Sequence, residues 1–175
     1  MRHLTALAAL LAAVPTSATL PRWNPRAPEN TQVLPSFTYA TVEPVLAAIG
    51  ARYQRGAPTG APTLLVTFAN GRKATLTMGA CNTAGTECRS LNIHSNWTRI
   101  ANSSPQRVSE AVERFNRQYS FAKAYFTSDG RPAMQRYLTA DYGYIRGNLA
   151  INLLVFSTQV DRFARDVLQP LEARQ

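Results

Sequence analysis

The chain has 175 residues, with 19 lysines and arginines against 10 acidic residues, and a formal net charge of +9. This length suits one domain with a substantial hydrophobic core. The positive balance favours acidic partners, but the basic residues are dispersed and form no run of five or more, which argues against a nucleic-acid-binding protein.

The first 18 residues predict a secretory signal peptide. Arg2 gives a positive start, Leu4 to Val14 is an apolar run, and small residues precede a cleavage point after Ala18. The run is shorter than the roughly 20 residues of a membrane-spanning helix, so we expect no span. Cleavage would leave 18 basic and 10 acidic residues, a net charge of +8, on a periplasmic or secreted chain. A short N-terminal helix packed on the domain is the alternative.

Prolines separate this leader from the predicted domain. Residues 19–36 contain four prolines and few apolar side chains, so we expect a flexible linker there. The domain is expected over residues 37–170, with a short tail at residues 171–175.

The domain opens with a predicted helix and a hairpin. Apolar residues at helical spacing predict a helix from about Val42 to Ile49, with Thr41 as its cap. Residues 63–69 and 72–78 alternate between apolar and polar side chains, and Asn70-Gly71 between them favours a tight turn. A shorter strand is expected at residues 52–55.

The second half of the domain is also predicted to contain both helices and strands. The spacing predicts a strand over residues 91–97, a helix from Pro105 capped by Ser103 or Ser104, strands over residues 121–127 and 132–140 around Asp129-Gly130, and a helix over residues 147–168. The predicted fold is therefore α+β, an antiparallel sheet with flanking helices in the order α-β-β-β-β-α-β-β-α.

Three segments carry a family resemblance: CNTAGTEC, VERFNRQYSFAKAYFTSDG and NLAINLLVFSTQVDRF. Over residues 37–168 the chain resembles the YbjN domain family of bacterial proteins, with Phe115-Asn116, Asp129-Gly130 and Gly143 among the matching residues. The resemblance implies a fold similar to type III secretion chaperones, and members of the family are labelled sensory transduction regulators without an established activity. The chain differs from cytoplasmic members in its export signal.

The two cysteines, Cys81 and Cys88, are separated by a loop rich in turn-forming residues, and an oxidising compartment would let them pair. We expect a disulfide, with two reduced thiols as the alternative. A zinc site needs four ligands, and His94 is the one histidine that cleavage would leave, so we expect no metal. No dinucleotide or phosphate-binding glycine motif occurs, so we expect no cofactor.

Catalysis is not indicated by the remaining polar residues. The sequence has no Gly-x-Ser-x-Gly nucleophile motif for which His94 could act as the base. Glu110 and Glu113 lie among arginines on one predicted helix. We therefore expect a protein that is not an enzyme.

Binding to another protein is the function that these observations favour, with a homodimer as one form of it. Exposed aromatic side chains suit such contacts because each joins an apolar ring to a polar tip, and ordinary packing is the alternative role for them. The candidate surface comprises Tyr53, Trp97, Tyr125, Tyr137, Tyr142 and Tyr144. A second hypothesis is a cationic envelope protein that binds acidic lipid or polysaccharide.

Overall fold

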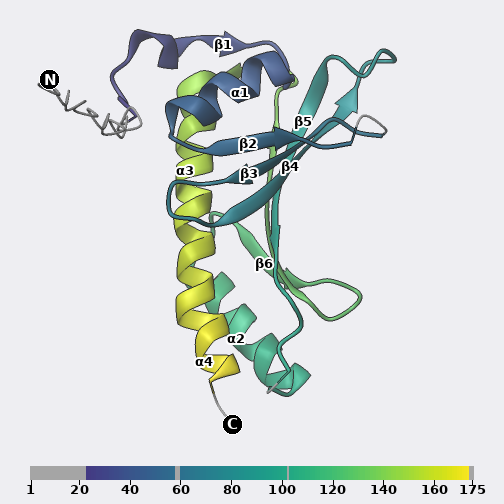
Figure 1. Ribbon diagram of the computed structural model, residues 1–175, viewed down its shortest axis with the longest axis vertical. Coiled ribbons are helices and arrows are strands. Elements are labelled where there is room, and N and C mark those ends of the chain that lie inside the picture. Colours follow the sequence, from purple (N-terminus) through teal and green to yellow (C-terminus); the bar gives the residue numbers. More distant parts are fainter. Residues whose placement is uncertain (1–22, 58–59, 102, 174–175) are drawn as a thin grey trace, which may run out of the picture.

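The computed structural model describes residues 23–57, 60–101 and 103–173. A six-stranded antiparallel sheet in the order β2-β3-β4-β5-β7-β6 forms its centre (Figure 1). The strands are β2 (Arg52–Arg55), β3 (Thr63–Thr67), β4 (Lys73–Cys81), β5 (Cys88–Asn96), β6 (Lys123–Phe126) and β7 (Pro132–Thr139).

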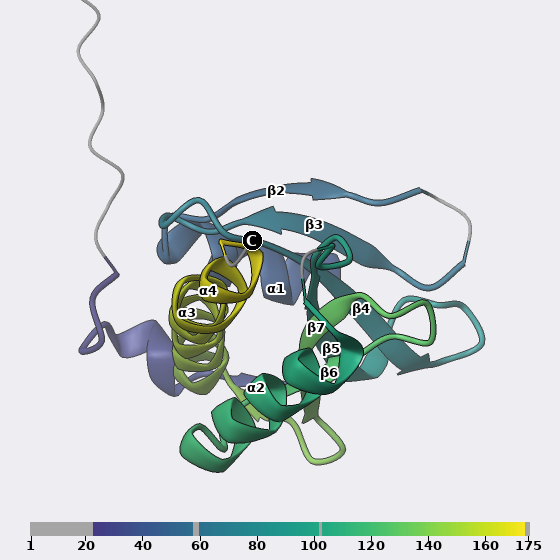
Figure 2. The ribbon, with the colours of Figure 1, turned by 90° about the horizontal axis from the view of Figure 1, so that it is seen from below.

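Three helices lie on one side of this sheet: α1 (Tyr39–Ala48), α2 (Pro105–Gln118) and α3 (Arg146–Phe163) (Figure 2). A π-helical turn, Ala164–Leu168, and α4 (Gln169–Glu172) extend α3. The prediction of an α+β fold with an antiparallel sheet and flanking helices is confirmed. Two short strands that were not predicted, β1 (Val33–Leu34) and β8 (Tyr144–Ile145), form a separate sheet.

The core lies between the sheet and α3. Leu64, Leu76 and Ile93 are fully buried on three adjacent strands, and cross-strand pairing of Leu64 with Leu76 and of Leu76 with Ile93 places them on one face. The side of α3 that faces them repeats apolar residues at helical spacing. Its buried residues include Leu149, Leu153, Phe156, Val160 and Phe163.

The hairpin between β3 and β4 is held against α3. Gly71 has a φ of 81°, which the turn requires and glycine adopts without steric cost. The Asn70 side-chain amide donates a hydrogen bond of 3.0 Å to the Ser157 carbonyl, and Arg72 pairs with Asp161 at 2.9 Å. The predicted Asn-Gly turn therefore also fixes the sheet to the long helix.

Helix α1 begins earlier than predicted. Thr38 is the N-cap, and its side chain accepts a hydrogen bond from the Thr41 backbone while the Thr41 hydroxyl accepts one from the Thr38 backbone. Thr41 is thus the third helical residue of a capping box and not the cap itself. Helix α2 has the predicted cap, Ser104, whose hydroxyl accepts from the Arg107 backbone.

The structure differs from the expected flexible linker over residues 23–36. A 3-10 helix, Pro28–Thr31, leads into β1, where Leu34 is only 4% exposed and pairs with Tyr144 of β8. A strand of two residues is too short to show apolar periodicity. The prolines around it therefore led to the prediction of a linker. The predicted signal peptide and residues 19–22 lie outside the described residues. Within the described ranges no helix has the length and hydropathy to cross a membrane.

Candidate functional site

The six predicted aromatic residues do not form one surface. Trp97 packs on Phe163 with ring centroids 5.2 Å apart, and Tyr144 packs on Phe37 at 5.4 Å. Tyr53 is also partly buried against the core. These three side chains contribute to packing.

The other three aromatic residues lie in two different places. Tyr125 and Tyr137 are on the strands β6 and β7, whereas Tyr142 lies just before β8 and is fully exposed. Tyr137 is 58% exposed and pairs across strands with Asn92. The exposed aromatics thus belong to two separate surfaces, the open face of the sheet and the end of the molecule at β1 and β8.

The first surface, which we call the end patch, consists of Val33, Tyr142, Ile145 and Ile151. Among the described residues, these are four of the six large hydrophobic side chains that are exposed. Val33 and Ile145 are cross-strand partners in the two-stranded sheet, so their side chains are neighbours. Ile145 and Ile151 also line a groove of about 520 Å³ together with Trp23. Val33, Ile145 and Ile151 are thus connected through Ile145 as apolar residues open to solvent, and Tyr142 lies near them along the chain, two residues before the start of β8.

Gly143 allows the end patch to form. Its φ is 87°, and a Cβ there would lie 2.6 Å from Val33 Cγ1 and 3.3 Å from the Leu34 carbonyl oxygen. A side chain at this position would therefore push β1 away from the turn that precedes β8.

Val33, Ile145 and Ile151 were not predicted from the sequence to be surface residues. Isolated aliphatic residues next to prolines or at the start of a helix give no signal of exposure. Only the pairing of β1 with β8 brings Val33 next to Ile145.

The second surface is the open face of the six-stranded sheet, opposite the helices. One row of cross-strand partners crosses all six strands on this face. In order, the row is Gln54, Leu65, Thr75, His94, Gln135 and Lys123. A neighbouring row contains Arg52, Thr67 and Lys73. The open face is therefore polar and basic.

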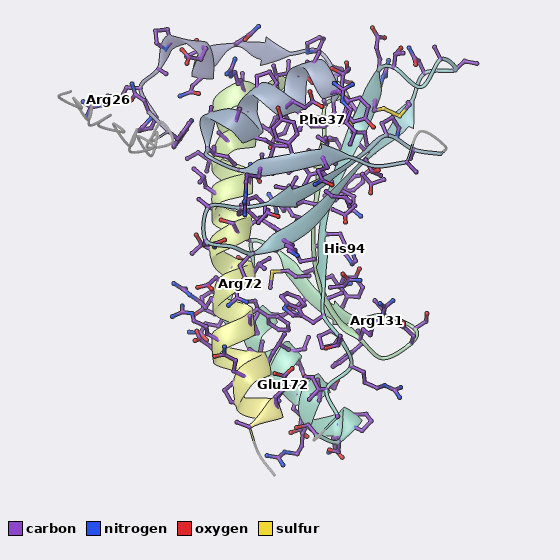
Figure 3. The ribbon with its side chains drawn as sticks, in the orientation of Figure 1. Arg26, Phe37, Arg72, His94, Arg131 and Glu172 are labelled. Atoms are coloured by element: carbon purple, nitrogen blue, oxygen red, sulfur yellow. A yellow bond between two sulfur atoms is a disulfide. The ribbon has the colours of Figure 1, made fainter. Side chains whose placement is uncertain are left out.

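His94 lies near the centre of this face. Both His94 and Arg131 are on the side of the sheet away from α3 (Figure 3). Partial burial, together with the positive charge of Arg131, lowers the pKa of His94 below its ordinary value. Burial raises the pKa of Tyr125, whose ring centroid is 6.2 Å from that of His94. Both rings are consequently uncharged at neutral pH.

The contacts of Asp129 stabilise the turn in which it lies. Asp129 receives a hydrogen bond from the Thr127 hydroxyl and pairs with Arg131 at 2.7 Å, and these contacts lower its pKa. Among the described residues, no group of three histidine, cysteine or acidic side chains could hold a metal ion. The Asp129-Gly130 dipeptide forms the turn between β6 and β7, where Gly130 has a φ of 77°.

Cys81 and Cys88 form a disulfide that closes the hairpin between β4 and β5. They are direct cross-strand partners, and Cys88 is 1% exposed. The backbone of Cys88 also exchanges two hydrogen bonds with Phe37, of 2.8 and 3.2 Å. The disulfide thus lies next to the segment that joins β1 to α1.

The residues that carried the family resemblance have structural roles. Phe115 is buried against Phe163, and the Asn116 side chain bonds to the backbone of β6. The sequence model of the YbjN family, described as "Putative bacterial sensory transduction regulator", matches residues 38–169. The chain belongs to the YbjN family. No curated protein matches this YbjN chain.

The family match covers the whole six-stranded sheet and nearly all of the helices. It begins after β1, so Val33 of the end patch precedes the matched segment. The described regulatory role agrees with a binding module more than with an enzyme.

Proposed function

We propose that this YbjN protein is an exported, non-catalytic module that binds another polypeptide in a chaperone-like or regulatory role. The end patch carries the proposal. Contiguous exposed apolar side chains on a soluble domain are typical of protein contacts, because burying them on a partner removes them from water. The predicted signal peptide supports export to the periplasm or beyond it.

The geometry of the end patch favours a polypeptide as its occupant. Val33 and Ile145 present adjacent aliphatic side chains, and fully exposed Tyr142 adds a ring with a polar tip. Apolar anchors of a partner chain would fit beside them, and the groove next to Ile151 extends the contact. A second copy of the chain is one such partner.

A pair of matched variants tests this proposal. Residues 19–175 would be expressed in the periplasm with a tag, and bound material would be captured at low and at high salt. Ile151→Gln alters the end patch, and Leu65→Gln makes a similar change at an aliphatic residue of comparable exposure on the open face. We expect the parent and Leu65→Gln to capture one dominant polypeptide that stays bound at high salt. We expect Ile151→Gln to capture none of it. Capture unaffected by Ile151→Gln would contradict it.

Light scattering on the same proteins identifies a homodimer. A parent dimer that Ile151→Gln converts to monomer would make the partner a second copy.

A second candidate function, a cationic binder of acidic envelope material, is favoured by the basic open face. It predicts anionic material that is released at high salt.

A further inference from the structure

The open face of the sheet contains a hollow that is unlike the end patch. Its volume is about 540 Å³, and its lining comes from the strands β2 to β5. The polar side chains at its surface include Arg52, Gln54, Thr67, Lys73, Thr75, His94 and Asn96. Among the residues that the structure describes, no aspartate or glutamate lines it.

The absence of acidic side chains extends over the whole sheet. None of the six strands contains an aspartate or a glutamate, although the complete chain has 10 of them. Within the described part of the chain, no ion pair joins Arg52, Lys73 or Lys123 to a carboxylate. Elsewhere several arginines are paired, as Arg55 is with Glu43 and Arg72 with Asp161. Arg52, Lys73 and Lys123 are therefore cations of the open face whose charge no described carboxylate neutralises in an ion pair.

The three cations are spread across the face. Arg52 and Lys73 lie in one row with Thr67 between them, two strand spacings apart, or about 10 Å at ~4.8 Å per strand. Lys123 lies three strands beyond Thr75 in the neighbouring row, about 14 Å from it by the same spacing. A ligand that meets all three must carry repeated negative charges along an extended chain.

The groups between the cations are hydroxyls, amides and neutral rings. Thr67, Thr75 and Asn96 can donate and accept hydrogen bonds, and Gln135 continues the row toward Lys123. Tyr125 and His94 offer uncharged ring faces at the same part of the sheet. Such groups complement the hydroxyls and apolar ring faces of sugars.

Two other anionic occupants fit less well. An extended peptide needs partners for its own backbone, and the backbones of the inner strands β3, β4, β5 and β7 are already paired on both sides. A lipid surface favours apolar side chains that insert below the headgroups. Within the described part of the chain, Leu65 is the one large exposed hydrophobic residue that lines the hollow.

We propose that the open face, from Arg52 and Lys73 across His94 to Lys123, binds an acidic polysaccharide. Carboxylates or sulfates of the sugar chain would pair with the three cations, and the hydroxyls would bond to the threonines and amides between them. This site is separate from the end patch, so the chain can bind a polysaccharide and a polypeptide at the same time.

The test uses oligogalacturonate as the probe and the same oligosaccharide with its carboxyls methyl-esterified as the neutral control. Residues 19–175 would be titrated by calorimetry at low salt, as the parent and as two double variants. Arg52→Gln with Lys73→Gln removes two charges from the open face. Arg107→Gln with Arg114→Gln removes two exposed charges from α2, and thermal melts check that both variants are folded.

We expect the open-face variant to bind the acidic oligosaccharide about tenfold or more weakly, and the α2 variant to differ from the parent by less than about twofold. We also expect amide shifts at Thr75 and His94 on binding. Equal losses in the two variants would show unspecific charge attraction and would overturn the proposal. Equal binding of the esterified probe, or binding to phosphatidylglycerol vesicles without binding to the acidic probe, would also overturn it.

Discussion

The Asn116 side chain binds both backbone polar groups of Ala124. Its amide nitrogen donates to the Ala124 carbonyl at 2.8 Å, and its amide oxygen accepts from the Ala124 N–H at 2.9 Å. Ala124 lies on β6, the strand at one edge of the sheet, and is 1% exposed. Helix α2 therefore closes this edge with a side chain that imitates a neighbouring strand, which prevents further strand pairing there.

Replacing Asn116 by alanine should destabilise the domain by about 2 kcal/mol, because a buried N–H and a buried C=O would both lose their partners. Gln118→Ala changes an exposed residue of the same helix and should alter stability by less than about 0.5 kcal/mol. Urea denaturation of the two variants measures the difference. Equal stabilities would mean that water satisfies Ala124 and that Asn116 does not hold the edge.

Gly143→Ala should cost more stability than Gly85→Ala. Both glycines have positive φ, of 87° and 69°, so each alanine carries a conformational cost of about 1 kcal/mol. At Gly143 the new Cβ would also meet Val33 and Leu34, whereas no atom of the described residues lies within 4 Å of a Cβ at Gly85. The added overpacking should be at least ~1 kcal/mol, measured by thermal unfolding. Equal costs would show that β1 moves freely to accommodate a side chain.

Removal of the disulfide should lower the free energy of unfolding by roughly 2.5 kcal/mol, from the short loop that it closes. Cys81→Ala with Cys88→Ala and the reduced parent protein should behave alike. Hydrogen exchange at the Phe37 amide should also accelerate, because that amide donates to the Cys88 carbonyl. Unchanged exchange at Phe37 would show that the segment before α1 is held without the disulfide.

The His94 side chain should titrate below its ordinary pKa of about 6.5, because burial and Arg131 disfavour its charged form. The unfolded chain then takes up the proton more readily, so stability is fully present above about pH 6.5 and falls as the pH drops toward the folded-state pKa. Its neighbours on this face include Arg131, Tyr125 and the cross-strand partners Thr75 and Gln135. A proton NMR titration measures the midpoint, and His94→Gln should flatten the stability profile below about pH 6.5. A midpoint above 6.5 would contradict this description.

Much of the fold followed from local patterns. The Asn70-Gly71 turn, the Ser104 cap of α2 and the Asp129-Gly130 turn were predictable because each depends on a few adjacent residues. The start of α1 was missed because Thr38 and Thr41 can both cap a helix, and only their mutual hydrogen bonds decide between them.

The candidate surfaces were harder to predict from the sequence than the fold. Trp97 and Tyr144 have the residue types of a binding surface, yet Phe163 and Phe37 bury one side of each ring. Val33 and Ile145 are more than 100 residues apart, and their proximity depends on the pairing of two-residue strands. The basic open face likewise requires the register of all six strands, which alternation alone does not give.

Hydrogen exchange on the captured complex shows most directly whether the partner binds at the end patch. With the partner bound, we expect slower exchange over residues 32–34 and 142–151, which carry the end patch, and unchanged exchange at the open-face residues 73–77. Protection confined to the open face, or no protection at the end patch, would contradict the proposal that this YbjN protein binds a polypeptide through Val33, Ile145 and Ile151.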